Sequence, residues 1–296
     1  MKLSQSLVFR VGIFLSLIPQ LVCGWGTKKD IFLGRENKNI LLIINYNHAH
    51  YESIPLLKEI YSPYFKNIVF YGPKKHKNVN FCAHNRGYLS YICIADAMKR
   101  YPHCDGYLFL MDDCILNAPL LKNLDTSKIW YLLYGFLNPE QLPQSLSLDK
   151  GPNATEWCWW HTQWGCKPIT AAFNKIPDHY KKVLAQNWGE SNVVAAYSDI
   201  VYIPSQYKEQ YSELATLFCN QAAFLESALP TIISCLDSKN NWIWLQGHGT
   251  YGKQPYKRYK FNVYFNHPLK LSEKKNRAFV RKLFKKMKKQ IGKSRI

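Results

Sequence analysis

Short apolar runs alternate with stretches of helical spacing over residues 40–113. The runs Ile40–Asn47, Asn67–Pro73 and Asp105–Asp113 have the length of strands and no helical spacing. Between them, residues 51–62 and 87–101 place apolar side chains at helical intervals. A run that is apolar throughout is typical of a strand buried on both faces, as in a parallel sheet. The alternation therefore predicts an α/β fold with a mostly parallel sheet flanked by helices.

The second half of the chain continues this pattern less regularly. Helical spacing is expected to reach about Cys219 and then to cover Gln221–Leu236, where Pro230 interrupts it. Gln246–Gly252 is rich in glycine, which predicts a loop able to close over a ligand. Three further strands are expected, at Ile129–Leu133, Asp199–Pro204 and Phe261–Pro268.

Two adjacent carboxylates, Asp112 and Asp113, stand where the third strand ends. Ligands of open α/β sheets bind at the carboxyl ends of strands, and a divalent cation held with substrate phosphates would relieve the repulsion between the carboxylates. Neighbouring strand residues point to opposite faces, so the pair shares one ligand only if the chain bends there. An acidic pair shortly before Pro119 also fits a turn or a helix cap. This stretch alone leaves both interpretations open.

Phosphate binding in the first half would need a cation, since that half contains neither a G-x-G-x-x-G nor a G-x-x-x-x-G-K pattern. The predicted sheet places Asn47 and Arg86 on the same edge as the acidic pair. Arg86 could meet a phosphate in a forked geometry, or it is an ordinary surface charge at a helix start.

The early strand–helix block followed by a strand that ends in an acidic pair resembles the metal-binding "DxD" region of GT-A-type glycosyltransferases. Cys114 stands in the third place of the motif, and the segment is closer to the acidic motif of exostosin-like and STELLO-like transferases. The resemblance covers roughly residues 40–120. It implies a nucleotide-sugar donor, a Mn²⁺ or Mg²⁺ ion, and Asp112 and Asp113 as metal and ribose contacts.

Three residues of the second half are further candidates for this chemistry. The resemblance implies His267 as the late histidine that completes the metal shell of many GT-A enzymes. Glu226 is a lone carboxylate among apolar residues, which suits a buried general base or the solvated side of a helix. If the reaction inverts the sugar, Glu226 or Asp237 is the candidate base, whereas a retaining enzyme needs no conventional base.

The densest aromatic stretch is Trp157–Cys166, with four Trp residues that suit a sugar ring or simply pack under a loop. Cys158, His161 and Cys166 match a zinc site weakly because a fourth ligand is missing. A local disulfide between Cys158 and Cys166 is the favoured pairing among the eight cysteines outside the targeting segment.

The amino terminus and the cysteine count indicate a translocated protein. Residues 1–24 resemble a signal peptide or a signal-anchor, with an apolar core shorter than a membrane span. An even number of remaining cysteines and the glycosylation acceptor Asn153-Ala154-Thr155 agree with an oxidising lumen. The expected location is the Golgi or endoplasmic reticulum lumen or the secreted space.

The net charge of +19 is concentrated in one tail. Residues 273–296 hold eleven Lys or Arg and one Glu, with apolar positions at helical spacing, so a basic amphipathic helix is expected. Contact with a membrane surface, contact with an acidic polymer and a plain solvated helix are all consistent with it. The expected compartment argues against nucleic-acid binding.

These observations predict a lumenal, metal-dependent glycosyltransferase that moves a sugar from a nucleotide sugar to a glycan or glycoprotein acceptor. Residues 30–272 are expected to form one GT-A-like catalytic domain, with a nucleotide-binding half at 30–125 and an acceptor half at 126–272. The alternative is a catalytically inactive glycan-binding protein of the same fold, which Cys114 favours. A glycoside hydrolase fits poorly, because its two carboxylates must flank the scissile bond from about 5 Å or more apart.

Overall fold

A computed structural model describes residues 39–134 and 143–293, with side chains described as far as residue 285. The predicted targeting segment and the end of the predicted tail lie outside the described residues. The strands of the main sheet are β1 Ile40–Asn45, β2 Asn67–Gly72, β3 Asn80–Phe81, β4 Gly106–Met111, β5 Ile115–Leu116, β6 Trp130–Tyr134, β9 Ile200–Pro204, β10 Ile243–Gly249 and β11 Phe265–His267.

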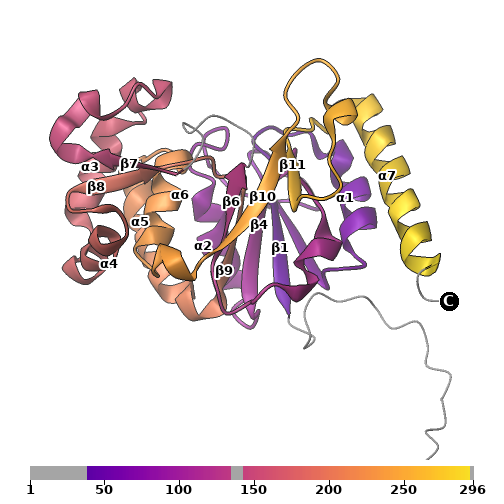
Figure 1. Cartoon of the computed structure of the whole chain (residues 1–296), viewed down its shortest axis with the longest axis horizontal. Coiled ribbons are helices and arrows are strands. Elements are labelled where there is room, and N and C mark those ends of the chain that lie inside the picture. Colours follow the sequence, from indigo (N-terminus) through magenta and orange to yellow (C-terminus); the bar gives the residue numbers. More distant parts are fainter. Residues whose placement is uncertain (1–38, 135–142, 294–296) are drawn as a thin grey trace, which may run out of the picture. The chain divides into compact units, whose positions relative to one another are not determined.

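Among the described residues, nine strands form this sheet in the order β3-β2-β1-β4-β9-β6-β10-β11-β5 (Figure 1). β1 pairs in parallel with β2 and β4, and β10 pairs in parallel with β6 and β11. β9 lies antiparallel between β4 and β6, and the edge strand β5 pairs antiparallel with β11. The predicted α/β fold with a mostly parallel sheet is confirmed. Both predicted halves of the chain contribute strands to it.

Helices cover the sheet on both sides. Figure 1 shows α1 and α7 on one side, with α2, α5 and α6 on the other. A small antiparallel sheet of β7 and β8 packs beside α6 with α3 and α4. The bounds are α1 Ile54–Tyr61, α2 Tyr91–Arg100, α3 Cys166–Lys175, α4 Asp178–Trp188, α5 Lys208–Asn220, α6 Leu225–Ser234, α7 Lys274–Lys293, β7 Gln144–Ser147 and β8 Asn192–Ala195.

The main sheet curls back on itself. β4 and β5 are five positions apart in the sheet order, a span of about 24 Å at the usual strand spacing of about 4.8 Å. Only Asp112, Asp113 and Cys114 separate them in sequence, and four extended steps reach at most about 14 Å. The outer strands must therefore fold back toward the carboxyl end of β4, and Figure 1 draws β10 and β11 across β4 and β1.

The prediction of a glycine-rich loop at Gln246–Gly252 is wrong for most of this stretch, because β10 continues to Gly249. Gly247 is needed for packing, since a Cβ atom there would come within 2.0 Å of the Phe265 ring on the neighbouring strand. The three glycines of this stretch match the spacing G-x-G-x-x-G, yet they lie in and after a strand rather than between a strand and a helix. They do not form a phosphate loop of that type.

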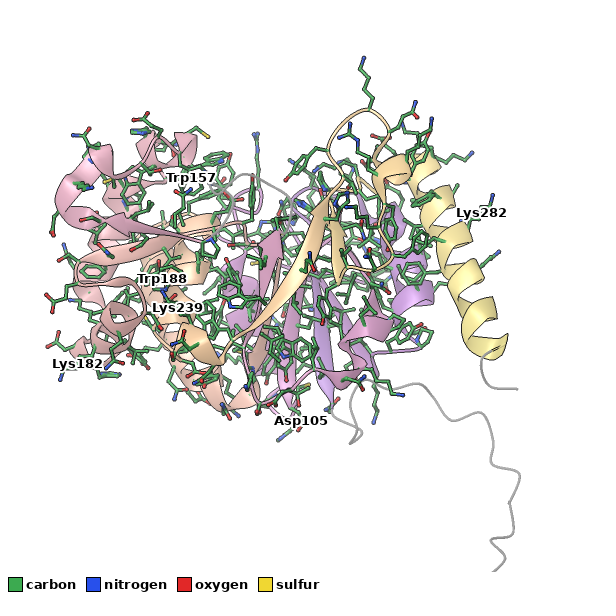
Figure 2. All side chains as sticks on the ribbon, viewed as in Figure 1. Asp105, Trp157, Lys182, Trp188, Lys239 and Lys282 are labelled. Carbon is green, nitrogen blue, oxygen red and sulfur yellow. The ribbon has the colours of Figure 1, made fainter. Side chains whose placement is uncertain are left out.

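The described part of the basic tail is an integral element of the fold. Val280, Leu283 and Phe284 of α7 are buried, and the Phe284 ring contacts Tyr61 of α1 at 6.3 Å between centroids. Lys282 lies on the exposed side of the helix (Figure 2). The apolar stripe of this part is therefore already packed and is not free to enter a membrane. Within residues 39–134 and 143–293, no helix has both the length and the apolar character needed to cross a bilayer.

Candidate functional site

The acidic pair lies in a tight turn at the carboxyl end of β4. The backbone amide of Cys114 donates to the carbonyl of Met111 at 3.0 Å, which closes a four-residue turn with Asp112 and Asp113 at its centre. The chain thus bends where a shared ligand would require it to bend. The turn interpretation of the pair also holds, because the two carboxylates occupy the turn that leads from β4 to β5.

Asp113 is bound by two cationic side chains from the end of β11. The Lys270 ammonium lies 2.5 Å from Asp113 Oδ2, and His267 Nε2 lies 3.4 Å from Asp113 Oδ1. The backbone strengthens this junction, since the amide of Leu269 donates to the carbonyl of Asp113 at 2.7 Å. The curl of the sheet is what allows residues 154 to 157 positions apart in sequence to meet.

A second carboxylate, Asp199, faces the same histidine. His267 Nε2 lies 3.3 Å from Asp199 Oδ1, while the Tyr134 hydroxyl donates to Asp199 Oδ2 at 3.0 Å. The Tyr134 oxygen is also 2.9 Å from His267 Nδ1. Since that hydroxyl has one proton, donation to Asp199 leaves it as the acceptor for Nδ1–H. We call Asp113, Tyr134, Asp199, His267 and Lys270 the Asp113 cluster.

Charge pairing governs protonation in the Asp113 cluster. Burial disfavours the imidazolium form of His267, yet the carboxylates of Asp199 and Asp113 outweigh it and raise its pKa to about 9. Burial likewise opposes ionisation of Asp113, but His267 and Lys270 hold its pKa below the usual range. Burial together with the charge of Asp113 raises the pKa of Asp199. The histidine is therefore a cation that links two carboxylates.

Two further carboxylates experience the field of the Asp113 cluster. Burial raises the pKa of Glu226, in the first turn of α6, to about 8, and the charge of Asp199 adds to this rise. Burial followed by the charge of Asp113 raises the pKa of half-buried Asp112. A carboxyl group with a pKa close to neutrality can both accept and release a proton, as acid–base chemistry requires.

The predicted contacts Asn47 and Arg86 lie on one edge but differ in exposure. The Asn47 amide oxygen accepts from Asn45 Nδ2 at 3.1 Å, and it leaves no room for a Cβ on Gly87. Arg86 is exposed and has a left-handed backbone conformation, with φ of 56°. The loop that carries Arg86 is thus packed against the end of β1, while the guanidinium itself is open to solvent.

Asp237 is not brought to the Asp113 cluster. It follows the carboxyl end of α6, whereas Glu226 lies at the amino end, and the ten-residue helix between them is about 15 Å long. Its carboxylate accepts from the Ser238 amide at 2.7 Å and from Asn241 at 3.0 Å, so it stabilises a turn. Lys239 of this turn lies over the Trp188 ring at 4.0 Å (Figure 2). This geometry gives a catalytic role for Asp237 no support.

The donor atoms of the Asp113 cluster fit a hard divalent cation chemically. Carboxylates suit Mn²⁺ and Mg²⁺, an imidazole is an acceptable further ligand, and Oδ1 of Asp113 and of Asp199 both face His267 Nε2. Among the described residues, however, no three His, Cys, Asp or Glu side chains are spaced to hold a metal ion. The carboxylates of Asp113 and Asp199 form ion pairs with cationic side chains of the protein instead. A metal could bind here only after His267 lost its Nε2 proton.

The aromatic stretch packs on residues that flank the sheet edge. Trp159 stacks on Phe224 at 4.7 Å, and Tyr88 contacts both Trp159 and Trp164 edge-on at 5.4 Å. Figure 2 shows Trp157 toward the carboxyl ends of the strands, away from Asp105 at the start of β4. Trp160 is fully buried, so for this residue the packing interpretation holds.

The thiols of this region are unpaired in the structure. All eight described cysteines are free, Cys158 and Cys166 included, so a disulfide between these two stays a prediction. The described residues also give the weak zinc match no support.

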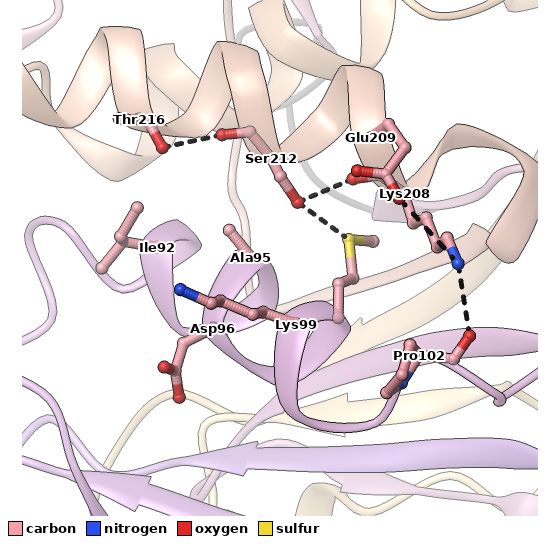
Figure 3. A pocket seen from close by; sticks show the side chains of 10 residues that line it. Ile92, Ala95, Asp96, Lys99, Pro102, Lys208, Glu209, Ser212 and Thr216 are labelled. Atoms are coloured by element: carbon pink, nitrogen blue, oxygen red, sulfur yellow. Dashed lines mark hydrogen bonds and ion pairs between the residues drawn. The ribbon is translucent and has the colours of Figure 1, made fainter.

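A groove of about 600 Å³ lies between α2 and α5 (Figure 3), and its lining residues include no member of the Asp113 cluster. Each side of the groove carries one acidic and one basic residue, Asp96 and Lys99 on α2, and Lys208 and Glu209 on α5. It lies on the helical layer, and opposite charges balance within it. No set of catalytic side chains converges there, and we place the candidate site at the Asp113 cluster.

Three members of the Asp113 cluster, Tyr134, Asp199 and Lys270, were not among the predicted site residues. Asp199 precedes β9, and the antiparallel direction of β9 brings the start of this strand to the edge where the parallel strands end. Tyr134 is the last residue of β6, and Lys270 follows β11 closely. Tyr134 and Lys270 share one sequence feature with His267, a polar side chain at or just after the end of a strand. That feature could have identified both of them.

Comparisons with known proteins show a distant relationship to glycosyltransferases. No protein-family model matches the chain. It is 20% identical over 220 residues to "Probable glycosyltransferase STELLO2" of Arabidopsis thaliana, and 20% identical over 216 residues to "Probable glycosyltransferase STELLO1" of the same plant. Each match covers 73% of this chain and 27% of the relative, so the chain spans about a quarter of the length of these relatives.

Two solved structures show weak likeness. One is a glycosyltransferase involved in the glycosylation of the major capsid of PBCV-1, with a TM-score of 0.40, 12% identity and coverage of 82% of this chain and 98% of that one. The other is the apo structure of the bifunctional glycosyltransferase WbbM, with a TM-score of 0.36, 12% identity and coverage of 78% and 45%. The sequence matches place the chain as a distant relative of the STELLO glycosyltransferases.

Proposed function

We propose that this protein is a glycosyltransferase of the secretory pathway that uses a nucleotide-sugar donor. The observation that carries the proposal is the Asp113 cluster, in which carboxylates, a histidine and a lysine from distant strands meet at the carboxyl edge of an α/β sheet. Distant kinship with the STELLO proteins supports the same conclusion. The compartment rests on the predicted targeting segment.

The donor diphosphate is proposed to bind between the Asp112–Asp113 turn and the loop of Arg86. Lys270 would exchange its ion pair with Asp113 for the phosphates, because its side chain is 64% exposed and carries the ammonium on a flexible four-carbon stem. Mn²⁺ or Mg²⁺ would be held by Asp113, Asp199 and His267 only after His267 lost its Nε2 proton and the three side chains moved into ligand spacing. Once bound, the ion would supply a Lewis acid for the charge on the departing diphosphate. Asp112 is the proposed ribose contact.

Glu226 is the proposed base that takes the proton of an acceptor hydroxyl. Its raised pKa means that the carboxylate is a stronger base than an exposed glutamate. Phe224, two residues earlier, packs on the Trp stretch, so a sugar held against Trp157 or Trp159 would lie close to this helix start. Holding donor and acceptor in reacting geometry can contribute roughly 7–11 kcal/mol to the rate acceleration.

A catalytically inactive glycan-binding protein is the second candidate. It is favoured by the pairing of both carboxylates with His267 and Lys270, which neutralises Asp113 and Asp199 without a metal. Such a protein would bind glycan through the Trp stretch and show no affinity for a nucleoside diphosphate.

The test is calorimetric binding of nucleoside diphosphates with and without Mn²⁺, followed by a nucleotide-sugar hydrolysis screen on the purified chain. We expect Mn²⁺-dependent binding that falls at least tenfold in Asp113→Asn and is kept in Asp178→Asn, an exposed aspartate on α4. Glycan binding without nucleotide binding would refute the enzyme and support the second candidate.

A further inference from the structure

Two cysteines beside the sheet edge stand closer together than unbonded atoms normally do. Cys82 directly follows β3, and Cys93 lies in the first turn of α2. Their sulfur atoms are 2.7 Å apart, whereas unbonded heavy atoms are most stable at about 3.5 Å or more. We propose that Cys82 and Cys93 form a disulfide that closes the base of the loop between β3 and α2.

The surroundings of the two thiols assign them different roles. Cys93 is fully buried and donates to Asn45 Oδ1 at 3.7 Å, and burial raises the pKa of its thiol. Cys82 is half-buried, so an oxidant in solution reaches it first. A third sulfur, Cys219 on α5, is close enough to act electrostatically on both thiols.

The oxidation balances with a small-molecule disulfide such as oxidised glutathione as the oxidant. The Cys82 thiolate attacks one glutathione sulfur, forms a mixed disulfide and releases one glutathione as a thiolate, which takes up a proton. Cys93 then loses its proton and attacks the Cys82 sulfur, so the second glutathione leaves. Two protein thiols lose two electrons and two protons in total, and one oxidised glutathione becomes two reduced molecules.

The bond would fix the loop that lies over the end of β1. Asn85, Arg86 and Gly87 all have positive φ angles, of 47°, 56° and 91°, and Gly87 packs directly on Asn47. A non-glycine residue with positive φ carries a conformational cost that surrounding contacts must offset. A covalent closure between residues 82 and 93 removes loop freedom from the unfolded chain and so favours this conformation.

Peptide mapping tests the bond directly. The full chain is equilibrated with oxidised and reduced glutathione, free thiols are alkylated, and tryptic peptides are analysed by mass spectrometry. Cleavage at Lys77, Arg86 and Lys99 separates the cysteines, so the disulfide joins peptides 78–86 and 87–99, with a mass two hydrogens below their sum. Alkylation of both cysteines under oxidising conditions overturns the proposal, and so does a link from either one to Cys219.

Thermal unfolding gives a second, independent measurement. Oxidised wild-type protein is expected to have a Tm about 5–10 °C above the reduced protein. This difference should vanish in Cys82→Ser and persist in Cys158→Ser, which changes an exposed cysteine elsewhere. Equal Tm values for the oxidised and reduced wild type would contradict the proposed effect on the loop. Neither measurement depends on glycosyltransferase activity.

Discussion

At the scale of single residues, His267 decides how two buried carboxylates can coexist. Asp113 and Asp199 would repel each other, and the imidazolium between them turns that repulsion into two attractions. Breaking a buried ion pair by removing one partner is strongly destabilising, because the other charge is left uncompensated. The histidine is therefore a structural cation as well as a proposed metal ligand.

His267→Gln should lower the free energy of unfolding by about 3 kcal/mol at pH 6, measured by urea denaturation with a chelator present. The folded pKa of about 9 lies above the unfolded value of 6.5, so the stabilisation is complete below pH 6.5 and is lost as the pH rises through 9. The difference in unfolding free energy between wild type and His267→Gln should therefore be smaller at pH 10 than at pH 6. His103→Gln, at an exposed position, is the control, and a deficit that does not change with pH would contradict the assignment.

Glu226 makes a separate prediction about activity. If it is the base, kcat/KM should rise with pH up to about pH 8 and then level, because only the carboxylate accepts a proton. Glu226→Gln should lose 10²-fold or more in kcat and lose this pH dependence, while Glu209→Gln on the exposed side of α5 should keep both. A variant with nearly full activity would point to a retaining reaction without a conventional base.

At the scale of elements, the junction of β10 and β11 shows how a small residue sets a strand pairing. Phe265 fills the space above Gly247, its register partner on β10. The same register places His267 beside Gly249, at the end of the sheet that carries the Asp113 cluster. Packing at one residue pair thus helps to fix where the histidine emerges.

Gly247→Val should destabilise the protein by about 1–3 kcal/mol, because the added methyl groups overlap the Phe265 ring. Chemical denaturation measures the change. The double variant Gly247→Ala with Phe265→Leu should recover part of the loss, since the smaller side chain makes room. Equal stability of Gly247→Val and wild type would show that this contact does not constrain the pairing.

The elements that could be predicted from sequence are those whose pattern is local. Three apolar runs gave β1, β2 and β4, and helical spacing gave α1 and α2. The direction of β9 could not be predicted, because an apolar run looks the same in a parallel and in an antiparallel strand. Asp199 was missed because only the antiparallel direction brings the start of β9 to the site. Gly247 was assigned to a loop because the Phe265 ring that requires it lies 18 residues away.

At the scale of the whole molecule, the basic helix α7 completes the cover of α1. Half-buried Arg277 pairs with Glu52 at 3.4 Å, and exposed Arg281 pairs with Glu59 at 3.5 Å. Ion pairs at the protein surface add little stability. The buried apolar residues of α7 contribute more. Charge in the sequence made the tail look like a separate appendage, whereas its packing joins it to the fold.

Phe284→Ala should cost about 3–5 kcal/mol in unfolding free energy, because it empties a buried site against Tyr61. Lys282→Ala, two residues away on the exposed side, should change it by less than about 0.5 kcal/mol. Thermal and chemical denaturation of the two variants make the comparison. Similar small effects for both would mean that the helix is dispensable for folding.

The short link between β4 and β5 has a geometric consequence for the site. Its three residues include both members of the acidic pair, and the same residues limit how far the outer strands can swing from β4. Extra residues in this link would relax the curvature and carry His267 away from Asp113, even with every side chain of the cluster unchanged. The motif therefore has a permitted length as well as a permitted composition.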